Sequence, residues 1–145
     1  MGSVALDSIL VTPLARIPVA GGDVMHAMKA ADPGYSGFGE AYFSWVEKGA
    51  VKAWKQHQRM TLNLVVPVGQ VSFVFCDLQD GGGCREVIIG DSNYARITVP
   101  AGIWFGFQGL GEPKSLVLNI ANIPHDPAER FNRKVEEIPY DWKEV

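Results

Sequence analysis

The sequence has 145 residues, 47% hydrophobic and 20% charged, which is enough for one buried core and too little for two. We therefore expect a single domain over residues 1–145. The net charge of -3, with scattered Lys and Arg residues, argues against a nucleic-acid partner. No apolar run is long enough to span a bilayer, and the start of the chain lacks the features of a signal peptide, so we expect a cytoplasmic protein without a membrane partner.

The first part of the chain is predicted to be extended. Pro13 and Pro18 restrict the residues before them, which favours an arm or edge strand over residues 1–20. Residues 23–30 are too few to separate a strand from a single helical turn. Residues 38–46 alternate as a strand and present one partly polar face, formed by Phe38, Glu40, Tyr42 and Ser44.

The stretch Gly49–Gly69 combines the densest group of basic and amide side chains with a long apolar strand. Alternate side chains of a strand share a face, so Lys55 and His57 are predicted to point the same way. Lys52, Trp54, Gln56 and Gln58 are predicted to point the other way. Lys55 and His57 are therefore the first candidates for a working site. The alternative is an edge strand on which both side chains are merely solvated.

Several short strands separated by Gly, Pro and Asn turns follow, which favours an antiparallel sandwich or barrel over parallel βαβ units. A jelly-roll barrel is the natural closure. The tail is predicted to hold a short C-terminal helix, because Asp126 can cap it, Pro127 suits its first position and Glu129 is placed as a capping-box acid. The two cysteines, Cys76 and Cys84, form neither a C-x-x-C pair nor a disulfide-rich pattern, so we predict two free thiols.

The spacing of Lys55-x-His57, Leu62 and Gly69, followed by Pro100-Ala101-Gly102 and Phe105, resembles the two-part signature of the cupins, which are small jelly-roll barrels. In that signature the positions of Lys55, His57, Leu62 and Phe105 usually carry three His and one Glu, which hold a metal. One of these four ligands remains here. Because a transition metal needs three or more donors, we predict a cupin without metal, in which Phe105 fills the position of the metal.

Among such cupins, the chain resembles the dTDP-4-dehydrorhamnose 3,5-epimerase family, which acts on nucleotide-linked 4-keto-6-deoxy sugars. The resemblance rests on FGEAYFSWVEKGAVKAWKQH, ITVPAGIWFGFQGL and SLVLNIANIPHDPAE. It places Lys52 on the family's phosphate-binding Arg and Lys55 on its catalytic His. The family's general-acid Tyr, expected near Leu118 or Asn119, is absent, and the chain ends before the segment whose Asp orients the catalytic His.

Epimerisation next to a ketone needs a base, stabilisation of the enolate, and an acid that returns the proton to the opposite face. Lys55 is the candidate base, since burial lowers the pKa of an ammonium group, and His57 can share or relay the proton. Tyr42 on the neighbouring strand is the candidate acid. In the alternative interpretation, Lys55 stays charged and binds a carbonyl or phosphate, His57 lines the barrel, and Tyr42 belongs to the core.

The candidate binding residues are chosen for their chemistry. Lys52 and Arg59 suit a diphosphate, and Trp104, Trp45 or Trp54 suits a base or sugar ring. The resemblance places Glu40 on the family's substrate-contacting Gln and Ser44 on its Ser, so both are candidate partners of sugar hydroxyls. A polar strand face at the barrel mouth is the alternative for these two.

The sequence therefore predicts an epimerase or isomerase of a nucleotide-linked 4-keto sugar, without metal or redox cofactor. The alternative is a non-catalytic cupin that binds a sugar nucleotide or another small molecule. We also predict a homodimer, because the apolar arm of residues 3–20 can cover an edge strand of a partner, as in the relatives that the chain resembles. The arm can instead pack on its own barrel.

Overall fold

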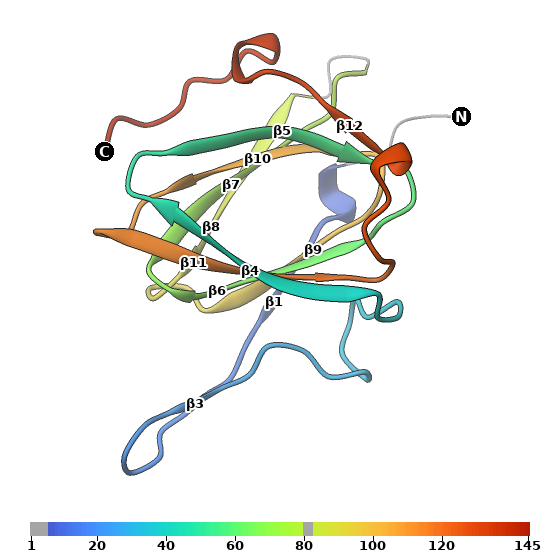
Figure 1. Cartoon of the computed structure of the whole chain (residues 1–145). Coiled ribbons are helices and arrows are strands. Elements are labelled where there is room, and N and C mark those ends of the chain that lie inside the picture. The colour runs from blue at the N-terminus through green and yellow to red at the C-terminus, as the bar shows by residue number, and fades with distance from the viewer. Residues whose placement is uncertain (1–5, 80–82) are drawn as a thin grey trace.

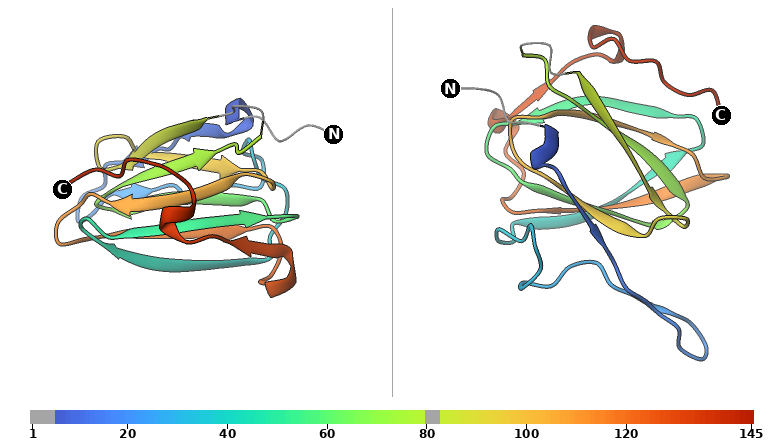
Figure 2. Two further views of the ribbon diagram at one scale, coloured as in Figure 1. Left: turned by 90° about the horizontal axis from the view of Figure 1, so that it is seen from above. Right: turned by 180° about the vertical axis from the view of Figure 1, so that it is seen from behind.

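The computed structural model describes residues 6–79 and 83–145, which form two five-stranded sheets that face each other and a separate two-stranded hairpin (Figure 1). The first sheet has the order β1-β9-β6-β11-β4, and the second has the order β12-β5-β10-β7-β8. The first sheet contains β1 (Leu10–Pro13), β4 (Glu40–Glu47), β6 (Leu62–Val68), β9 (Ala95–Val99) and β11 (Lys114–Ala121). The second contains β5 (Val51–His57), β7 (Gln70–Cys76), β8 (Cys84–Gly90), β10 (Trp104–Gly109) and β12 (Arg130–Asn132). The hairpin pairs β2 (Arg16–Ile17) with β3 (Val24–Met25) and projects away from the barrel (Figures 1 and 2).

Most neighbours within a sheet are far apart in the chain, and all paired strands run antiparallel. This is the arrangement of a jelly roll, in which the chain crosses repeatedly between two sheets. The predicted all-β jelly-roll barrel is therefore confirmed. The remaining elements in the described part of the chain are the 3-10 turns η1 (Leu6–Ser8), η2 (Pro127–Glu129) and η3 (Val135–Glu137). Nowhere in that part is a helix long and apolar enough to cross a membrane.

The core lies between the two sheets. Leu64 and Ile97 from the first sheet, and Phe73 and Phe75 from the second, are at most 2% exposed. Each such side chain stabilises the fold by roughly 1.5–3 kcal/mol relative to an exposed one. This packing fills the end of the barrel formed by β6 to β9 and leaves the space between β4 and β5 for polar side chains.

The C-terminal segment after β12 runs over the outer face of the second sheet (Figures 1 and 2). The buried Trp54 of β5 donates a hydrogen bond from Nε1 to the carbonyl oxygen of Val135 at 3.0 Å, and its ring centroid lies 5.3 Å from that of Trp142. Gln108 of β10 donates from Nε2 to the carbonyl oxygen of Lys143 at 2.7 Å. β5 is thus supported from outside, which fixes the strand that carries Lys55 and His57.

The predicted C-terminal helix is wrong. Asp126 does cap a turn, since its Oδ1 accepts from the N–H of Ala128 at 3.0 Å, and Pro127 begins it, but this turn is the single 3-10 turn η2. Glu129 does not act as a capping-box acid because its carboxylate bonds to the β5–β6 region instead. The next residue, Arg130, begins strand β12, which pairs with β5 and ends the helical conformation.

The prediction of two free thiols is also wrong. Cys76 and Cys84 form a disulfide between β7 and β8, with their Cα atoms 4.1 Å apart. They face each other directly in the register of this hairpin. The sequence pattern did not reveal this pair because only the register of β7 against β8 brings the two cysteines together. The intervening glycine-rich loop leaves that register open.

The described part of the N-terminal arm contains an edge strand, as predicted, because β1 lies at the end of the first sheet. β1 pairs with β9 of the same barrel, from Leu10 opposite Thr98 to Pro13 opposite Ala95. This segment therefore packs on its own barrel, which was the alternative left open by the sequence. Residues 3–5 of the predicted arm lie outside the described residues.

Candidate active site

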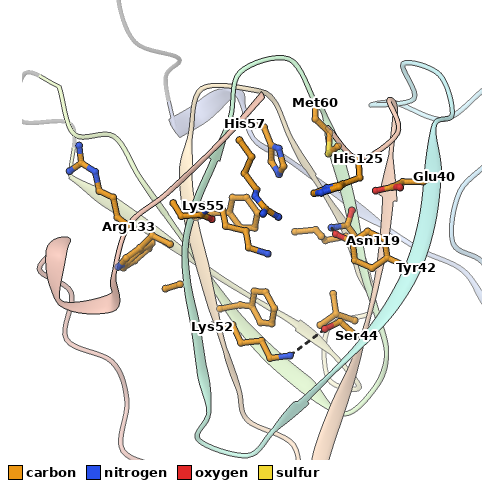
Figure 3. A pocket seen from close by; sticks show the side chains of 18 residues that line it. Glu40, Tyr42, Ser44, Lys52, Lys55, His57, Met60, Asn119, His125 and Arg133 are labelled. Atoms are coloured by element: carbon orange, nitrogen blue, oxygen red, sulfur yellow. Dashed lines mark hydrogen bonds between the residues drawn. The ribbon is translucent and has the colours of Figure 1, made fainter. Parts of the chain in front are cut away.

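A cavity of about 370 Å³ lies between β4 and β11 on one side and β5 and β12 on the other (Figure 3). This volume suits a small-molecule ligand. The floor is apolar and includes Leu64, Phe105, Phe107 and Val117. Polar side chains converge above it: Glu40, Tyr42 and Ser44 from β4, Lys52, Lys55 and His57 from β5, Asn119 from β11, His125 from the loop after β11, Arg130 and Asn132 from β12, and Arg133 just after it.

Lys52 lies on the same face of β5 as Lys55 and His57, so the prediction that it points the other way is wrong. Against β10, Phe105 is opposite Lys55 and Gly106 is opposite Ala53, which leaves Trp54 as an extra residue. This bulge shifts the alternation by one residue. A Cβ at Gly106 would lie 2.5 Å from the Cβ of Ala53, so a glycine is required opposite the bulge. The bulge brings all three basic side chains to one wall.

His57 is held by a buried carboxylate. Its Nδ1 donates a hydrogen bond to Oε1 of Glu129, and the two side chains are 11% and 3% exposed. The second carboxylate oxygen accepts from the backbone N–H groups of Arg59 at 3.0 Å and Met60 at 3.1 Å. Burial by itself would raise the pKa of Glu129, but the hydrogen bonds from His57 and these two N–H groups outweigh it and lower the pKa. An ionised Glu129 fixes the imidazole and leaves Nε2 free to exchange a proton.

Lys55 projects from β5 into the cavity (Figure 3). Burial lowers the pKa of its amine, and the positive charges of Arg130 and Lys52 lower it further. Among the described residues no carboxylate forms an ion pair with Lys55 or Arg130. A neutral amine is thereby favoured at a lower pH than for a solvated lysine, which is the property that a general base requires.

Tyr42 lies on β4, across the cavity from Lys55 and His57 (Figure 3). Burial raises the pKa of its phenol, and the nearby charge of Glu40 raises it further. Its hydroxyl oxygen accepts a hydrogen bond from Nδ2 of Asn119 at 3.1 Å. Tyr42 and Asn119 are direct partners in the register of β4 and β11. The hydroxyl of Tyr42 therefore lies next to position 119, near which the sequence resemblance placed the absent general acid.

The other predicted binding residues divide into two groups. Lys52 donates from Nζ to Oγ of Ser44 at 3.3 Å and to the carbonyl oxygen of Trp45 at 2.7 Å, so it ties β5 to β4 at one end of the cavity. Glu40 lines the cavity at its other end (Figure 3). Arg59 lies outside the cavity and pairs with Asp126 at 3.0 Å. Trp104 also lies outside, covered by Arg133, whose guanidinium carbon is 4.8 Å from its ring centroid.

The cavity or supporting residues that the sequence did not identify include Glu129, Arg130, Asn119 and His125. The sequence predicts Glu129 as a capping-box acid. Asn119 lies in a segment that carries the family resemblance, but the resemblance implies a Tyr near this position, and Arg130 lies just beyond that segment. The described residues contain no group of three or more His, Cys, Asp and Glu side chains placed to hold a metal ion. Phe105 forms part of the cavity floor, and its ring stacks on His57 with the centroids 6.2 Å apart.

The fold and sequence were compared with known proteins. No family model matches the sequence. The structure of a dTDP sugar isomerase from Desulfovibrio desulfuricans G20 superposes with a TM-score of 0.88 and is 35% identical, covering 94% of this chain and 91% of that one. QdtA, a sugar 3,4-ketoisomerase from Thermoanaerobacterium thermosaccharolyticum solved in complex with TDP, superposes with a TM-score of 0.74 at 14% identity over 91% of this chain and 92% of its own, which supports the fold alone.

A probable low-salt glycan biosynthesis epimerase, Agl13 from Haloferax volcanii, is 30% identical over 106 residues. The match covers 70% of this chain and 66% of that relative, so the chain spans about two thirds of its length. The similarity to the Desulfovibrio isomerase extends over nearly the whole of both chains, with the same jelly-roll barrel. The chain therefore belongs to the cupin family of dTDP-sugar isomerases and epimerases.

Proposed function

We propose that the protein isomerises or epimerises a nucleotide-linked 4-keto-6-deoxy sugar by removing a proton from a carbon next to the ketone. The observation that carries this proposal is the placement of Lys55 and His57 on one wall of the cavity and Tyr42 on the opposite wall (Figure 3). A sugar ring bound between these walls exposes one face to a base and the other to an acid. Inversion at a carbon requires that arrangement.

In the proposed reaction, the neutral amine of Lys55 takes the proton and the C–H electron pair moves into an enolate. His57, oriented by Glu129, accepts a proton from Lys55 or shares it. Tyr42 then donates the phenolic proton to the other face of the carbon. Proton removal and return leave the oxidation state of the sugar unchanged, so the reaction needs no redox cofactor.

For binding, Lys52 at one end of the cavity is the proposed partner of the diphosphate, and Ser44 and Glu40 are the proposed partners of sugar hydroxyls. The relatives support this ligand class, since QdtA was solved with TDP, and a 3'-monoepimerase from Streptomyces bikiniensis was solved with dTDP. Because Arg59 and Trp104 lie outside the cavity, they belong to the proposed site only if the substrate extends beyond it.

The proposal is tested by incubating the protein with dTDP- and GDP-linked 4-keto-6-deoxyhexoses and following the sugar signals by NMR. We expect a new isomer from one of these substrates. Saturable binding of a sugar nucleotide without any isomer would instead support the non-catalytic cupin.

We also propose that the protein is a homodimer. Phe43 and Trp45 on the outer face of β4 are 64% and 48% exposed, and Ile17, Val19 and Val24 on the projecting hairpin are 43–49% exposed. Such a set of exposed apolar side chains is typical of an interface. Sedimentation should show a dimer at micromolar concentration, and F43D should shift it toward monomer. A wild-type monomer would contradict the proposal.

A further inference from the structure

Arg130 occupies a position that neither the sequence nor the reaction above explains. It is the first residue of β12, and its Cα lies directly opposite that of His57 in the register of β12 and β5. The preceding residue is Glu129, whose carboxylate binds His57. The chain thus fixes Arg130 relative to His57 by the same two strands that fix the imidazole.

Arg130 is half-buried, and its guanidinium has a donor that is not satisfied within the described part of the chain. Its Nε is buried without a hydrogen-bond partner among residues 6–79 and 83–145. No carboxylate within these ranges forms an ion pair with it. A buried donor without an acceptor is destabilising, so this group is stabilised when a ligand supplies an oxygen.

The place of Arg130 indicates which oxygen it binds. It lines the cavity together with Lys55 and Tyr42, and its positive charge acts on both groups. It therefore lies near the proposed base and the proposed acid. The atom between these two groups during the reaction is the α-carbon. The ketone oxygen on the adjacent carbon becomes negatively charged as the proton leaves, so it is the acceptor that a cation in this part of the cavity stabilises.

We infer that Arg130 is a catalytic residue that donates hydrogen bonds to the ketone oxygen of the sugar and stabilises the enolate. This inference rests on the proposed function. As the α-proton moves to Lys55, the C–H electron pair forms the C=C bond and the carbonyl π electrons move onto the oxygen that Arg130 holds. When Tyr42 returns a proton to carbon, the electrons flow back and the C=O bond reforms. The guanidinium only donates hydrogen bonds and transfers no proton in either step.

The position of Arg130 also affects Lys55. A fixed cation beside Lys55 favours the neutral amine, so Arg130 acts on the base as well as on the substrate. A residue that served only the diphosphate would instead alter nucleotide affinity. These two roles are separable by experiment.

The test compares R130Q and R130K with the wild type and with R16Q, a matched control on the hairpin outside the cavity. For each protein we would measure the melting temperature, the Kd for dTDP by calorimetry, and the rate of deuterium incorporation from D2O into the 4-keto sugar as a function of pH. We expect R130Q to lower the exchange rate by about 10²–10³-fold, as for the loss of one oxyanion donor, while the Kd for dTDP changes by less than about threefold. The pH at which the exchange rate rises, which the ionisation of Lys55 sets, should move to a higher value. R130K should be intermediate, and R16Q should match the wild type.

An R130Q exchange rate within about threefold of the wild type would overturn the inference and leave the proposed function intact. A loss of dTDP affinity as large as the loss of rate would also overturn it, in favour of a diphosphate contact. If R130Q does not fold, R130K carries the same comparison. Absence of exchange in the wild type would overturn the proposed function and this inference together.

Discussion

Glu129 and His57 are 72 residues apart in the chain, and their side chains meet in a hydrogen bond at the edge of the cavity. The carboxylate also accepts the backbone N–H groups of Arg59 and Met60, so it joins the C-terminal part of the chain to the end of β5. In the family that the chain resembles, the carboxylate that orients the catalytic His comes from a later segment. Glu129 supplies one from the turn before β12 and orients the second basic residue of the Lys-x-His pair.

E129Q should lower the free energy of unfolding by about 2 kcal/mol at neutral pH. The reason is that an amide at this position can accept only some of the hydrogen bonds that the buried carboxylate accepts. The folded-state pKa of Glu129 lies below its ordinary value, so the carboxylate stabilises the fold fully above the ordinary glutamate pKa, and this contribution is lost as the pH falls through the lowered pKa. The difference between wild type and variant should therefore shrink on acidification. Denaturant titrations at several pH values measure it.

E112Q is the control for this experiment, because Glu112 is 79% exposed and pairs with Lys48 at 3.5 Å. A surface pair contributes about 0–1 kcal/mol, so E112Q should change little. A gap between wild type and E129Q that stays constant down to strongly acidic pH would contradict the role of the ionised carboxylate.

Lys55 should set the acidic limb of the activity profile. The neutral amine is the base, so the rate should rise with pH through a pKa that burial, Arg130 and Lys52 lower from the ordinary lysine value. K55R keeps a cation but cannot lose its proton near neutrality, and it should reduce the exchange rate by about 10²–10⁴-fold. K55H should restore part of the exchange activity, with a rate that rises near pH 6.5, the ordinary histidine pKa. Retention of the wild-type rate by K55R would exclude Lys55 as the base.

Tyr42 should affect the formation of the inverted product more strongly than it affects proton removal. Its raised pKa keeps the phenol protonated at neutral pH, as a proton donor must be. Y42F should still exchange the α-proton with D2O, because the base wall is intact, but formation of the inverted product should fall by about 10²-fold or more. NMR of the recovered sugar distinguishes exchange from inversion. Y35F, which changes a tyrosine outside the cavity, is the control. If Y42F still formed the inverted product at the wild-type rate, another group would have to be the acid.

The Cys76–Cys84 disulfide should stabilise the hairpin without affecting the reaction. It closes a loop with a sequence separation of 8, and neither cysteine lines the cavity. The chain-entropy relation gives about 2.5 kcal/mol for such a loop. C76S/C84S should lose this amount in denaturant unfolding and retain the exchange rate, and alkylation without reductant should label no thiol in the wild type. Labelling of both thiols would contradict the disulfide.

Sequence reasoning found the parts of the site that follow from local periodicity. Lys55 and His57 face the cavity because alternate residues of β5 share a face, and the same rule placed Glu40, Tyr42 and Ser44 together on β4. It failed at Lys52 because the bulge at Trp54 depends on the register against β10. A local sequence pattern does not contain that register.

The remaining errors also arose from long-range contacts. The segment Asp126-Pro127-Ala128-Glu129 satisfies the local rules for a helix start, yet its glutamate binds more favourably to His57 and two distant N–H groups. Asn119 and Arg130 become part of the site through strand pairing with β4 and β5. The jelly roll itself was predictable because it rests on many short alternating strands, and no single contact decides it.

Removal of a proton next to a ketone is the step that this cavity is proposed to perform, and solvent isotope exchange measures that step directly. The wild-type protein would be incubated in D2O with a dTDP-linked 4-keto-6-deoxyhexose, and the sugar would be recovered for NMR and mass spectrometry. We expect enzyme-dependent incorporation of deuterium at a carbon adjacent to the ketone, with R16Q as active as the wild type and K55R strongly impaired. Recovery of unlabelled sugar under conditions in which calorimetry shows saturated binding would contradict it.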